Sequence, residues 1–181
     1  MKNLLFTLLL ILPFQGFSQI EKAVKPVASP LPVLPAEALR ASAGKTRAVV
    51  IGISDYQDAG IPDLRFADKD AEAFANFLRS PAGGSLDGDH LKVLLNSEAT
   101  TAQFDAALGW LMDECKPGDQ AIIYFSGHGD VETKTRSQQG FLLCWDSPPQ
   151  AYVSGAYPIF FLKEVVSTLS LENKARVIVV T

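Results

Sequence analysis

The chain has 181 residues, of which 48% are hydrophobic and 20% charged, so it is long enough to bury one full hydrophobic core. It carries 16 Lys and Arg against 20 Asp and Glu, a formal net charge of −4, and the basic residues are scattered along the sequence. Nucleic acids and anionic membranes require concentrated positive charge, so neither is expected as a partner.

Two N-terminal segments precede the predicted domain. Residues 1–18 have the features of a secretory signal peptide, because a lysine precedes an apolar run at 4–14 and small residues follow that run. This predicts a secreted or periplasmic protein with no membrane attachment after cleavage; an uncleaved N-terminal anchor is the alternative. Residues 19–44 contain four prolines among Ala, Val and Ser, which predicts an extended linker. The folded domain, 45–181, is expected to begin near Lys45.

Within this domain, short apolar runs rich in β-branched residues alternate with segments of helical periodicity. Strands are predicted at 47–53, 90–96, 119–125, 140–145 and 175–180, the last of them a buried strand. Helices are predicted at 68–79, 100–114 and 161–169. Alternating strands and helices predict an α/β sandwich around a largely parallel sheet.

One histidine occupies a position suited to catalysis. His128 follows the third predicted strand and lies between Gly127 and Gly129. Catalytic groups of parallel sheets gather beyond the carboxyl ends of the strands, and flanking glycines allow a sharp turn and a close approach of substrate. A neutral imidazole can accept and return a proton near pH 7. A histidine that only caps the strand is the alternative, which the two glycines disfavour.

Four segments, in the same order, resemble motifs of the caspase-like cysteine peptidases, the peptidase C14 group that includes caspases, metacaspases and paracaspases. They are the first strand RAVVIGISDY at 47–56, the loop LRFADKDA at 64–71, the histidine motif IIYFSGHG at 122–129 and the strand FLLCWD at 141–146. The resemblance covers about residues 46–181. It implies a three-layer, Rossmann-like α/β sandwich, with helices on both faces of a mostly parallel central sheet and its C-terminal part missing from this chain.

The resemblance also implies a reaction, the attack of a thiolate on a peptide carbonyl. It assigns His128 the role of general acid and base, and it makes the Gly129 N–H a donor to the oxyanion. The nucleophilic cysteine is expected about 50 residues after the histidine, where the family's strand continues into Asp-Ala-Cys-His-Ser-Gly or a similar sequence. The chain is therefore expected to be cut just before its nucleophile.

Two functions stay open at this stage. The first is a cysteine-type endopeptidase acting on protein or peptide substrates through a Cys-His dyad. The second is a catalytically inactive caspase-like domain that binds proteins. The residue that follows the last predicted strand distinguishes them, because only the enzyme requires a cysteine there.

The two cysteines of the chain, Cys115 and Cys144, are predicted to be buried free thiols. Each lies in a predicted core segment, and two cysteines carry no disulfide framework. Neither suits the nucleophile, because a reactive thiol requires an exposed, electropositive site. Together with His90 and His128 they also lack the spacing of zinc ligands, so no metal site is expected.

Asp70 is the candidate substrate-binding residue. By position it matches an aspartate that, in metacaspase-like members, helps to form a pocket for Arg or Lys. It could equally belong, with Asp68 and Glu72, to a group of carboxylates that only favours a helix N-terminus. Arg65 would instead fit the acidic preference of true caspases.

No cofactor is expected. Some metacaspases require calcium, and activation by calcium stays open here. The stretch 130–139 contains only two carboxylates, Asp130 and Glu132, which are too few for an oxygen-ligand cage.

Overall fold

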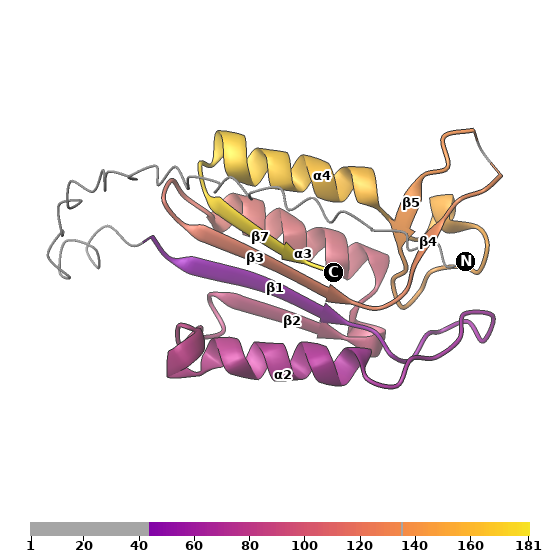
Figure 1. The fold of residues 1–181 in the computed structure, drawn as a ribbon, viewed down its shortest axis with the longest axis horizontal. Coiled ribbons are helices and arrows are strands. Elements are labelled where there is room, and N and C mark those ends of the chain that lie inside the picture. The colour runs from indigo at the N-terminus through magenta and orange to yellow at the C-terminus, as the bar shows by residue number, and fades with distance from the viewer. Residues whose placement is uncertain (1–43, 135) are drawn as a thin grey trace, which may run out of the picture. The chain divides into compact units, whose positions relative to one another are not determined.

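The computed structural model describes residues 44–134 and 136–181 (Figure 1). The signal peptide predicted for 1–18 and all but the last residue of the linker predicted for 19–44 lie outside the described residues. In the part that is described, no helix is both long enough and apolar enough to cross a membrane.

Four parallel strands form the central sheet, in the order β2-β1-β3-β7. They are β1 (Thr46–Gly52), β2 (Leu91–Leu95), β3 (Gln120–Ser126) and β7 (Arg176–Val180). Their apolar, β-branched runs are typical of strands in a parallel sheet. All four arrows point the same way in Figure 1, so their carboxyl ends share one edge of the sheet.

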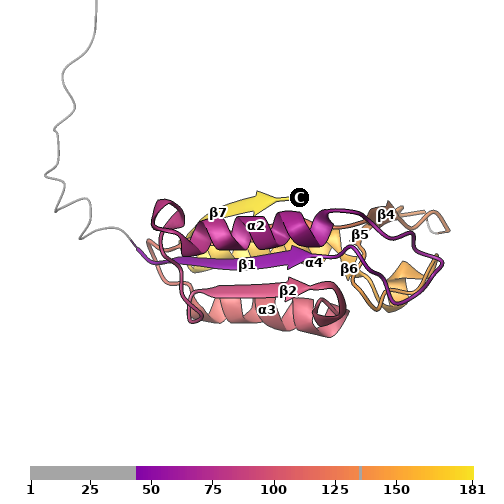
Figure 2. The same cartoon turned by 90° about the horizontal axis from the view of Figure 1, so that it is seen from below.

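Helices cover both faces of this sheet. They are α2 (Ala67–Arg79), α3 (Thr101–Glu114) and α4 (Ile159–Ser167), which continues into a π-helical turn, η4 (Thr168–Glu172). Figure 2 shows α2 and α3 on opposite sides of β1 and β2. The predicted three-layer α/β sandwich is confirmed.

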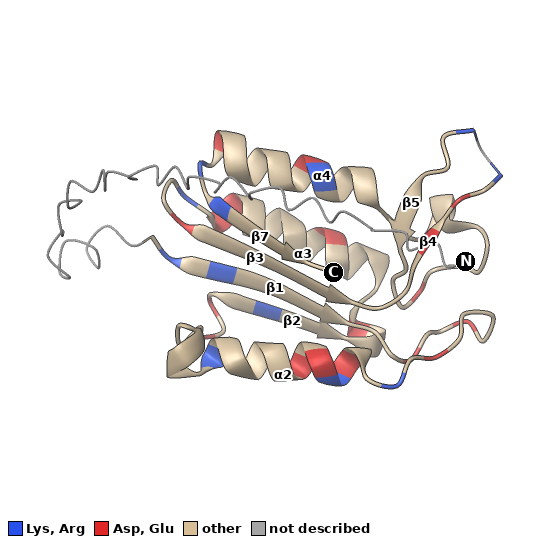
Figure 3. Ribbon diagram, in the orientation of Figure 1, with Lys and Arg blue, Asp and Glu red and all other residues tan. Residues whose placement is uncertain are grey.

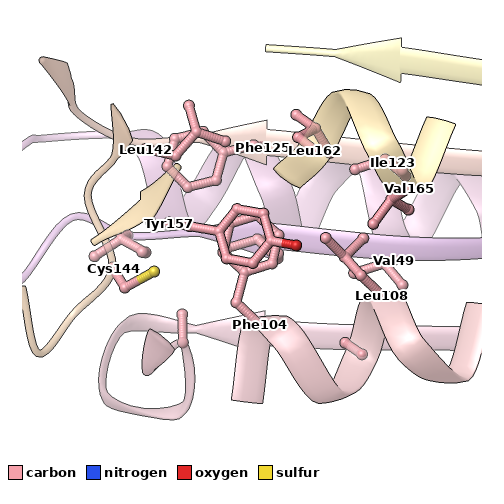
Figure 4. Packing of buried hydrophobic residues seen from close by; sticks show 14 of the residues in the cluster. Val49, Phe104, Leu108, Ile123, Phe125, Leu142, Cys144, Tyr157, Leu162 and Val165 are labelled. Atoms are coloured by element: carbon pink, nitrogen blue, oxygen red, sulfur yellow. The ribbon is translucent and has the colours of Figure 1, made fainter. Parts of the chain in front are cut away.

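Side chains of β1 alternate between the two layers of core. Ala48 and Val50 pack in the cluster under α2, whereas Val49 and Ile51 pack in the larger cluster with α3 and α4. Figure 4 shows the larger cluster, in which the ring of Phe104 of α3 stacks on Tyr157 (centroids 4.5 Å apart) and on Phe125 of β3 (5.9 Å). This alternation explains why the sequence of β1 is apolar at nearly every position.

A small antiparallel sheet lies beyond the carboxyl ends of the central strands (Figure 1). Its strands are β4 (Gly129–Val131), β5 (Gly140–Leu142) and β6 (Tyr157–Pro158). The strand predicted at 140–145 is wrong in its second half. The chain leaves the sheet after Leu142, because the Cys144 N–H donates to Ser147 Oγ (2.8 Å) and the Trp145 N–H to the carbonyl of Ala99 (2.9 Å).

The prediction that the last strand is buried is also wrong. Ile178, Val179 and Val180 of β7 are each about 40% exposed. Within the described residues β7 pairs with β3 alone, and α2 packs over β1, β2 and β3 instead. An apolar run identifies a strand, but it does not distinguish an edge strand from a central one.

Candidate active site

His128 lies in the turn between β3 and β4 and is held at three points. Its N–H donates to Tyr56 Oη (2.8 Å), and its carbonyl accepts from the Leu143 N–H (2.9 Å). Its ring atom Nε2 lies 2.7 Å from the carbonyl oxygen of Pro62. The residue predicted to be the catalytic base is therefore fixed through its backbone on both sides and through its ring.

The bond to Pro62 also assigns the tautomer of His128. A carbonyl oxygen can only accept a hydrogen bond, so Nε2 must carry the proton and donate it. In the neutral ring, Nδ1 then holds the lone pair. Among the described residues no group forms a hydrogen bond with Nδ1, so this nitrogen is available to take a proton from another molecule or residue.

The loop that contains Tyr56 and Pro62 is stabilised by hydrogen bonds between its own residues. The Tyr56 N–H donates to Asp63 Oδ1 (3.2 Å), and the Leu64 N–H donates to the carbonyl of Ser54 (2.8 Å). Tyr56 is only 5% exposed, and burial raises its pKa to about 12. Its hydroxyl therefore stays neutral throughout the physiological pH range.

Sequence reasoning missed both of these residues. Tyr56 had a usable signal, because it follows a strand at the carboxyl edge where catalytic groups gather. Pro62 had none, since it acts through a backbone carbonyl that every residue type has.

The two glycines beside His128 differ in their surroundings. A Cβ at Gly127 would lie 2.9 Å from Phe125 Cζ and 3.1 Å from Tyr56 Oη, so this position has no room for a side chain. At Gly129 the nearest atom would be the carbonyl oxygen of Phe141, at an ordinary 3.5 Å.

The backbone of Gly129 points away from its neighbouring strand. Gly129 pairs with Leu142 across β4 and β5, but the flanking bond runs from the Leu143 N–H to the carbonyl of His128. This pattern marks a non-hydrogen-bonded pair, in which the N–H groups face outward. The Gly129 N–H therefore points to the open side of β4, as an oxyanion donor would require.

Two cavities flank the histidine turn. The first, about 420 Å³, is lined by Gly127 and Gly129 on one side and by Val180 and Thr181, at the end of β7, on the other. The second, about 290 Å³, is lined by residues of the tyrosine loop and the small sheet, including Pro62, His128 and Asp130. His128 itself lines the second cavity, and the two glycines beside it line the first.

The two carboxylates considered for calcium are already engaged. Asp130 Oδ2 accepts from the Tyr152 hydroxyl (2.6 Å), and this bond, with one from the Val131 N–H, lowers the pKa of Asp130. The buried Glu132 accepts from the Lys134 N–H (2.8 Å). Within residues 44–134 and 136–181, no group of three His, Cys, Asp or Glu could hold a metal ion.

Asp68 and Asp70, in the first turn of α2, lie in different surroundings. Asp68 Oδ1 accepts from the Ser54 hydroxyl (2.7 Å), which lowers the pKa of Asp68, and Asn96 Nδ2 lies 3.4 Å from its other oxygen. Asp70 is exposed, and its carboxylate makes no hydrogen bond or ion pair with any described residue. Figure 3 shows acidic residues gathered at this end of α2 and in the loop before it, while Lys and Arg are scattered.

Both thiols are buried and free, as predicted. Cys144 is fully buried in the larger core cluster, and burial raises its pKa to about 12 (Figure 4). Burial also raises the pKa of Cys115, which is 2% exposed. Neither can supply a thiolate to His128 in this structure.

The structure thus has a histidine beyond the carboxyl ends of a parallel sheet whose two faces are covered by helices. The family model described as "Caspase domain", of peptidase C14, matches residues 45–180. The chain belongs to this family, and the resemblance inferred from its four motifs is confirmed.

Two known proteins show the extent of the similarity. The chain is 31% identical over 102 residues to Metacaspase-1 of Mycosarcoma maydis, a match that covers 53% of this chain and 24% of that protein. The crystal structure of protein GSU0716 from Geobacter sulfurreducens superposes with a TM-score of 0.55 at 19% identity, over 75% of this chain and 48% of that one. The chain thus spans about a quarter of the curated relative and about half of the solved structure, with which it shares the fold.

Proposed function

We propose that the full-length protein is a cysteine-type endopeptidase in which His128 is the general acid and base. Membership of the peptidase family supports hydrolysis of peptide bonds. The free Nδ1 of His128 and the outward Gly129 N–H supply a proton acceptor and an oxyanion donor. The nucleophile must be a third cysteine, because Cys115 and Cys144 are buried.

The register between β3 and β7 is the observation that carries this proposal. The first five residues of β3 pair with the β7 residues 56 positions later, from Gln120 with Arg176 to Tyr124 with Val180. At the same offset, position 184 would lie across from His128. The 420 Å³ cavity is lined by the end of β7 and by Gly127 and Gly129, so a cysteine near position 184 would enter it beside the turn that carries His128.

The reaction follows from these groups. Nδ1 of His128 takes the thiol proton, and the thiolate attacks the carbonyl carbon of the peptide. The Gly129 N–H donates to the oxyanion. The protonated imidazole then gives its proton to the leaving amine, and water hydrolyses the resulting acyl-enzyme. No step of this reaction uses a metal ion, and assays with and without a chelator test the calcium activation that the sequence leaves open.

For substrate binding, we propose that Asp70 recognises Arg or Lys at the cleavage position. Its exposed and unpaired carboxylate supports this role, as does the excess of acidic residues at that end of α2. The exposed Arg65 nearby would favour the opposite specificity. Peptides that differ only in Arg, Lys or Asp at the cleaved position separate the two, and Asp70→Asn should lower kcat/KM for the basic peptides alone.

The proposal is tested by expressing the complete gene and measuring hydrolysis of these peptides with the wild type, His128→Ala and His90→Ala. His90 is the matched control, because it is the chain's other histidine and pairs with Asp87 before β2. We expect His128→Ala to lower kcat at least about 10³-fold and His90→Ala to leave it unchanged. A chain of residues 1–181 alone should show no activity.

An inactive wild type would contradict the peptidase. If position 184 and its neighbours held no cysteine, the protein would instead be a caspase-like binding domain. Hydrolysis by residues 1–181 that His128→Ala abolishes would also contradict the proposal, because it would require Cys115 or Cys144 to be reactive.

We further propose that the protein is exported, which the composition of residues 1–18 supports. Fusing these residues to a reporter that is active only outside the cytoplasm tests this. An inactive fusion would contradict export.

A further inference from the structure

The hydroxyl of Tyr56 has no role in the reaction described above, yet it contacts the candidate base directly. Its oxygen accepts the backbone N–H of His128 at 2.8 Å. The tyrosine ring lies against the imidazole, with centroids 5.3 Å apart and planes tilted by 36°. One buried side chain therefore contacts both the backbone and the ring of His128.

Tyr56 is also linked to the residue that holds the other side of the imidazole. Its N–H donates to the side chain of Asp63, which directly follows Pro62. The backbone bond at His128 N and the ring bond at His128 Nε2 thus come from one closed loop.

We infer that Tyr56 is a positioning residue, whose hydroxyl holds His128 so that Nε2 donates to Pro62 and Nδ1 keeps its lone pair free of any described partner. The inference rests on the proposed function only in taking His128 as the catalytic base. The tautomer and orientation of His128, which the inference attributes to the Tyr56 hydroxyl, can be measured without an activity assay.

Two features favour a hydroxyl at this place. The oxygen lies 3.1 Å from the point where a Cβ of Gly127 would be, so the turn before His128 is packed directly on it. Burial raises the pKa of Tyr56 to about 12, so the oxygen remains a neutral acceptor across the physiological range. The hydrogen bond between the His128 N–H and the Tyr56 hydroxyl therefore does not change with pH in this range.

The test compares Tyr56→Phe with Tyr157→Phe. The first variant removes only the oxygen and keeps the ring against the imidazole. The second removes the hydroxyl of another buried tyrosine, 3% exposed, which stacks on Phe104 at 4.5 Å and does not touch His128. Thermal unfolding of both variants checks that each is folded.

Nitrogen-15 spectra of the chain report the His128 tautomer, and only two histidines need assignment. The wild type and Tyr157→Phe should show the Nε2–H form, whereas Tyr56→Phe should show a mixture of both tautomers. Hydrogen exchange at the His128 amide should become about tenfold faster or more in Tyr56→Phe alone. In the full-length protein, Tyr56→Phe should lower kcat by about 10- to 100-fold with little change in KM.

An unchanged tautomer and unchanged amide exchange in Tyr56→Phe would overturn the inference. So would the expected spectral changes with an unaltered kcat, because the hydroxyl would then position nothing that matters for catalysis. If the wild type were inactive while the spectra changed as expected, the proposed function would fail and Tyr56 would remain the residue that sets the His128 tautomer.

Discussion

Nε2 of His128 lies 2.7 Å from the carbonyl oxygen of Pro62, a residue 66 positions earlier in the chain. The imidazole is thus oriented by a neutral backbone acceptor, and no described carboxylate forms a hydrogen bond with the ring. A backbone acceptor fixes the tautomer as firmly as a side chain would, because it too can only accept. The orientation of His128 therefore depends on the shape of the loop 53–64 rather than on a charged partner.

The glycines beside His128 should tolerate substitution unequally. Gly127→Ala would place a methyl group 2.9 Å from Phe125 and 3.1 Å from the Tyr56 hydroxyl, so we expect it to destabilise the fold by about 1–3 kcal/mol. Gly129→Ala is the matched control. It meets only an ordinary contact and keeps the N–H, so it should cost less than about 1 kcal/mol.

Urea unfolding of the two glycine variants measures this difference. Equal losses would contradict the packing of the turn on Tyr56. In the full-length protein, activity retained by Gly129→Ala would agree with a role for its backbone alone.

Arg47 and Asp119 form a buried ion pair near the amino ends of β1 and β3, and their contributions to stability should be strongly coupled. Arg47 Nη1 lies 2.6 Å from Asp119 Oδ2, and both side chains are 8% exposed. Burial alone would raise the pKa of Asp119, but bonds from the Lys116 and Lys45 N–H groups and the Arg47 guanidinium lower it. Asp119→Asn leaves a buried guanidinium without its partner, so we expect a loss of about 3–5 kcal/mol.

A double-mutant cycle with Arg47→Met and Asp119→Asn checks this, and the coupling energy should exceed about 1.5 kcal/mol. Glu114→Gln is the control. Glu114 lies 3.7 Å from the same guanidinium but its side chain is 51% exposed, so its loss should cost less than about 0.5 kcal/mol. Additive effects in the cycle would show that the pair contributes nothing beyond its separate contacts.

Asp68 should make the stability of the fold depend on pH. The Ser54 hydroxyl lowers the pKa of Asp68, so the folded state favours the carboxylate. Its contribution is complete above the unfolded value of about 3.9 and is lost as the pH falls through the lower folded value. Because Asp68 is partly exposed, we expect Asp68→Asn to cost only about 1 kcal/mol at pH 7.

Unfolding of Asp68→Asn and Asp70→Asn at pH 7 and pH 3 tests this. The cost of Asp68→Asn should shrink at pH 3, while Asp70→Asn, at an exposed position in the same helical turn, should cost less than about 0.5 kcal/mol at pH 7. A pH-independent cost at Asp68 would mean that its hydrogen bonds serve the amide equally well.

The central layers of this fold could be predicted from the sequence because local patterns determine them. The apolar run of β1 is buried on both faces by α2 and α3, and nearly every residue of the run is apolar as a result. Strands as short as β4 and β6, three and two residues, carry too little pattern to be detected. The exposure of β7 depends on which strands pair with it, which no local run encodes.

Some residues of the candidate site could likewise be predicted from the sequence, and others could not. His128 and Gly129 could be predicted because they lie in one motif at the end of one strand. Tyr56 and Pro62 reach His128 from 72 and 66 positions away, and they do so through a hydroxyl and a backbone carbonyl. Contacts over such distances depend on the tertiary fold, and a backbone acceptor leaves no mark on the sequence.

Thiol reactivity gives a direct check on the proposed cysteine nucleophile. In native residues 1–181, neither Cys115 nor Cys144 should react with a thiol reagent at pH 8, because both are buried and burial raises the pKa of Cys144 to about 12. Both should react in denaturant, giving two thiols per chain. The full-length protein should show one further thiol that reacts rapidly in the native state, and His128→Ala should slow that thiol while His90→Ala should not. Rapid labelling of Cys144 in the native chain would contradict the structure, in which this thiol is fully buried in the core.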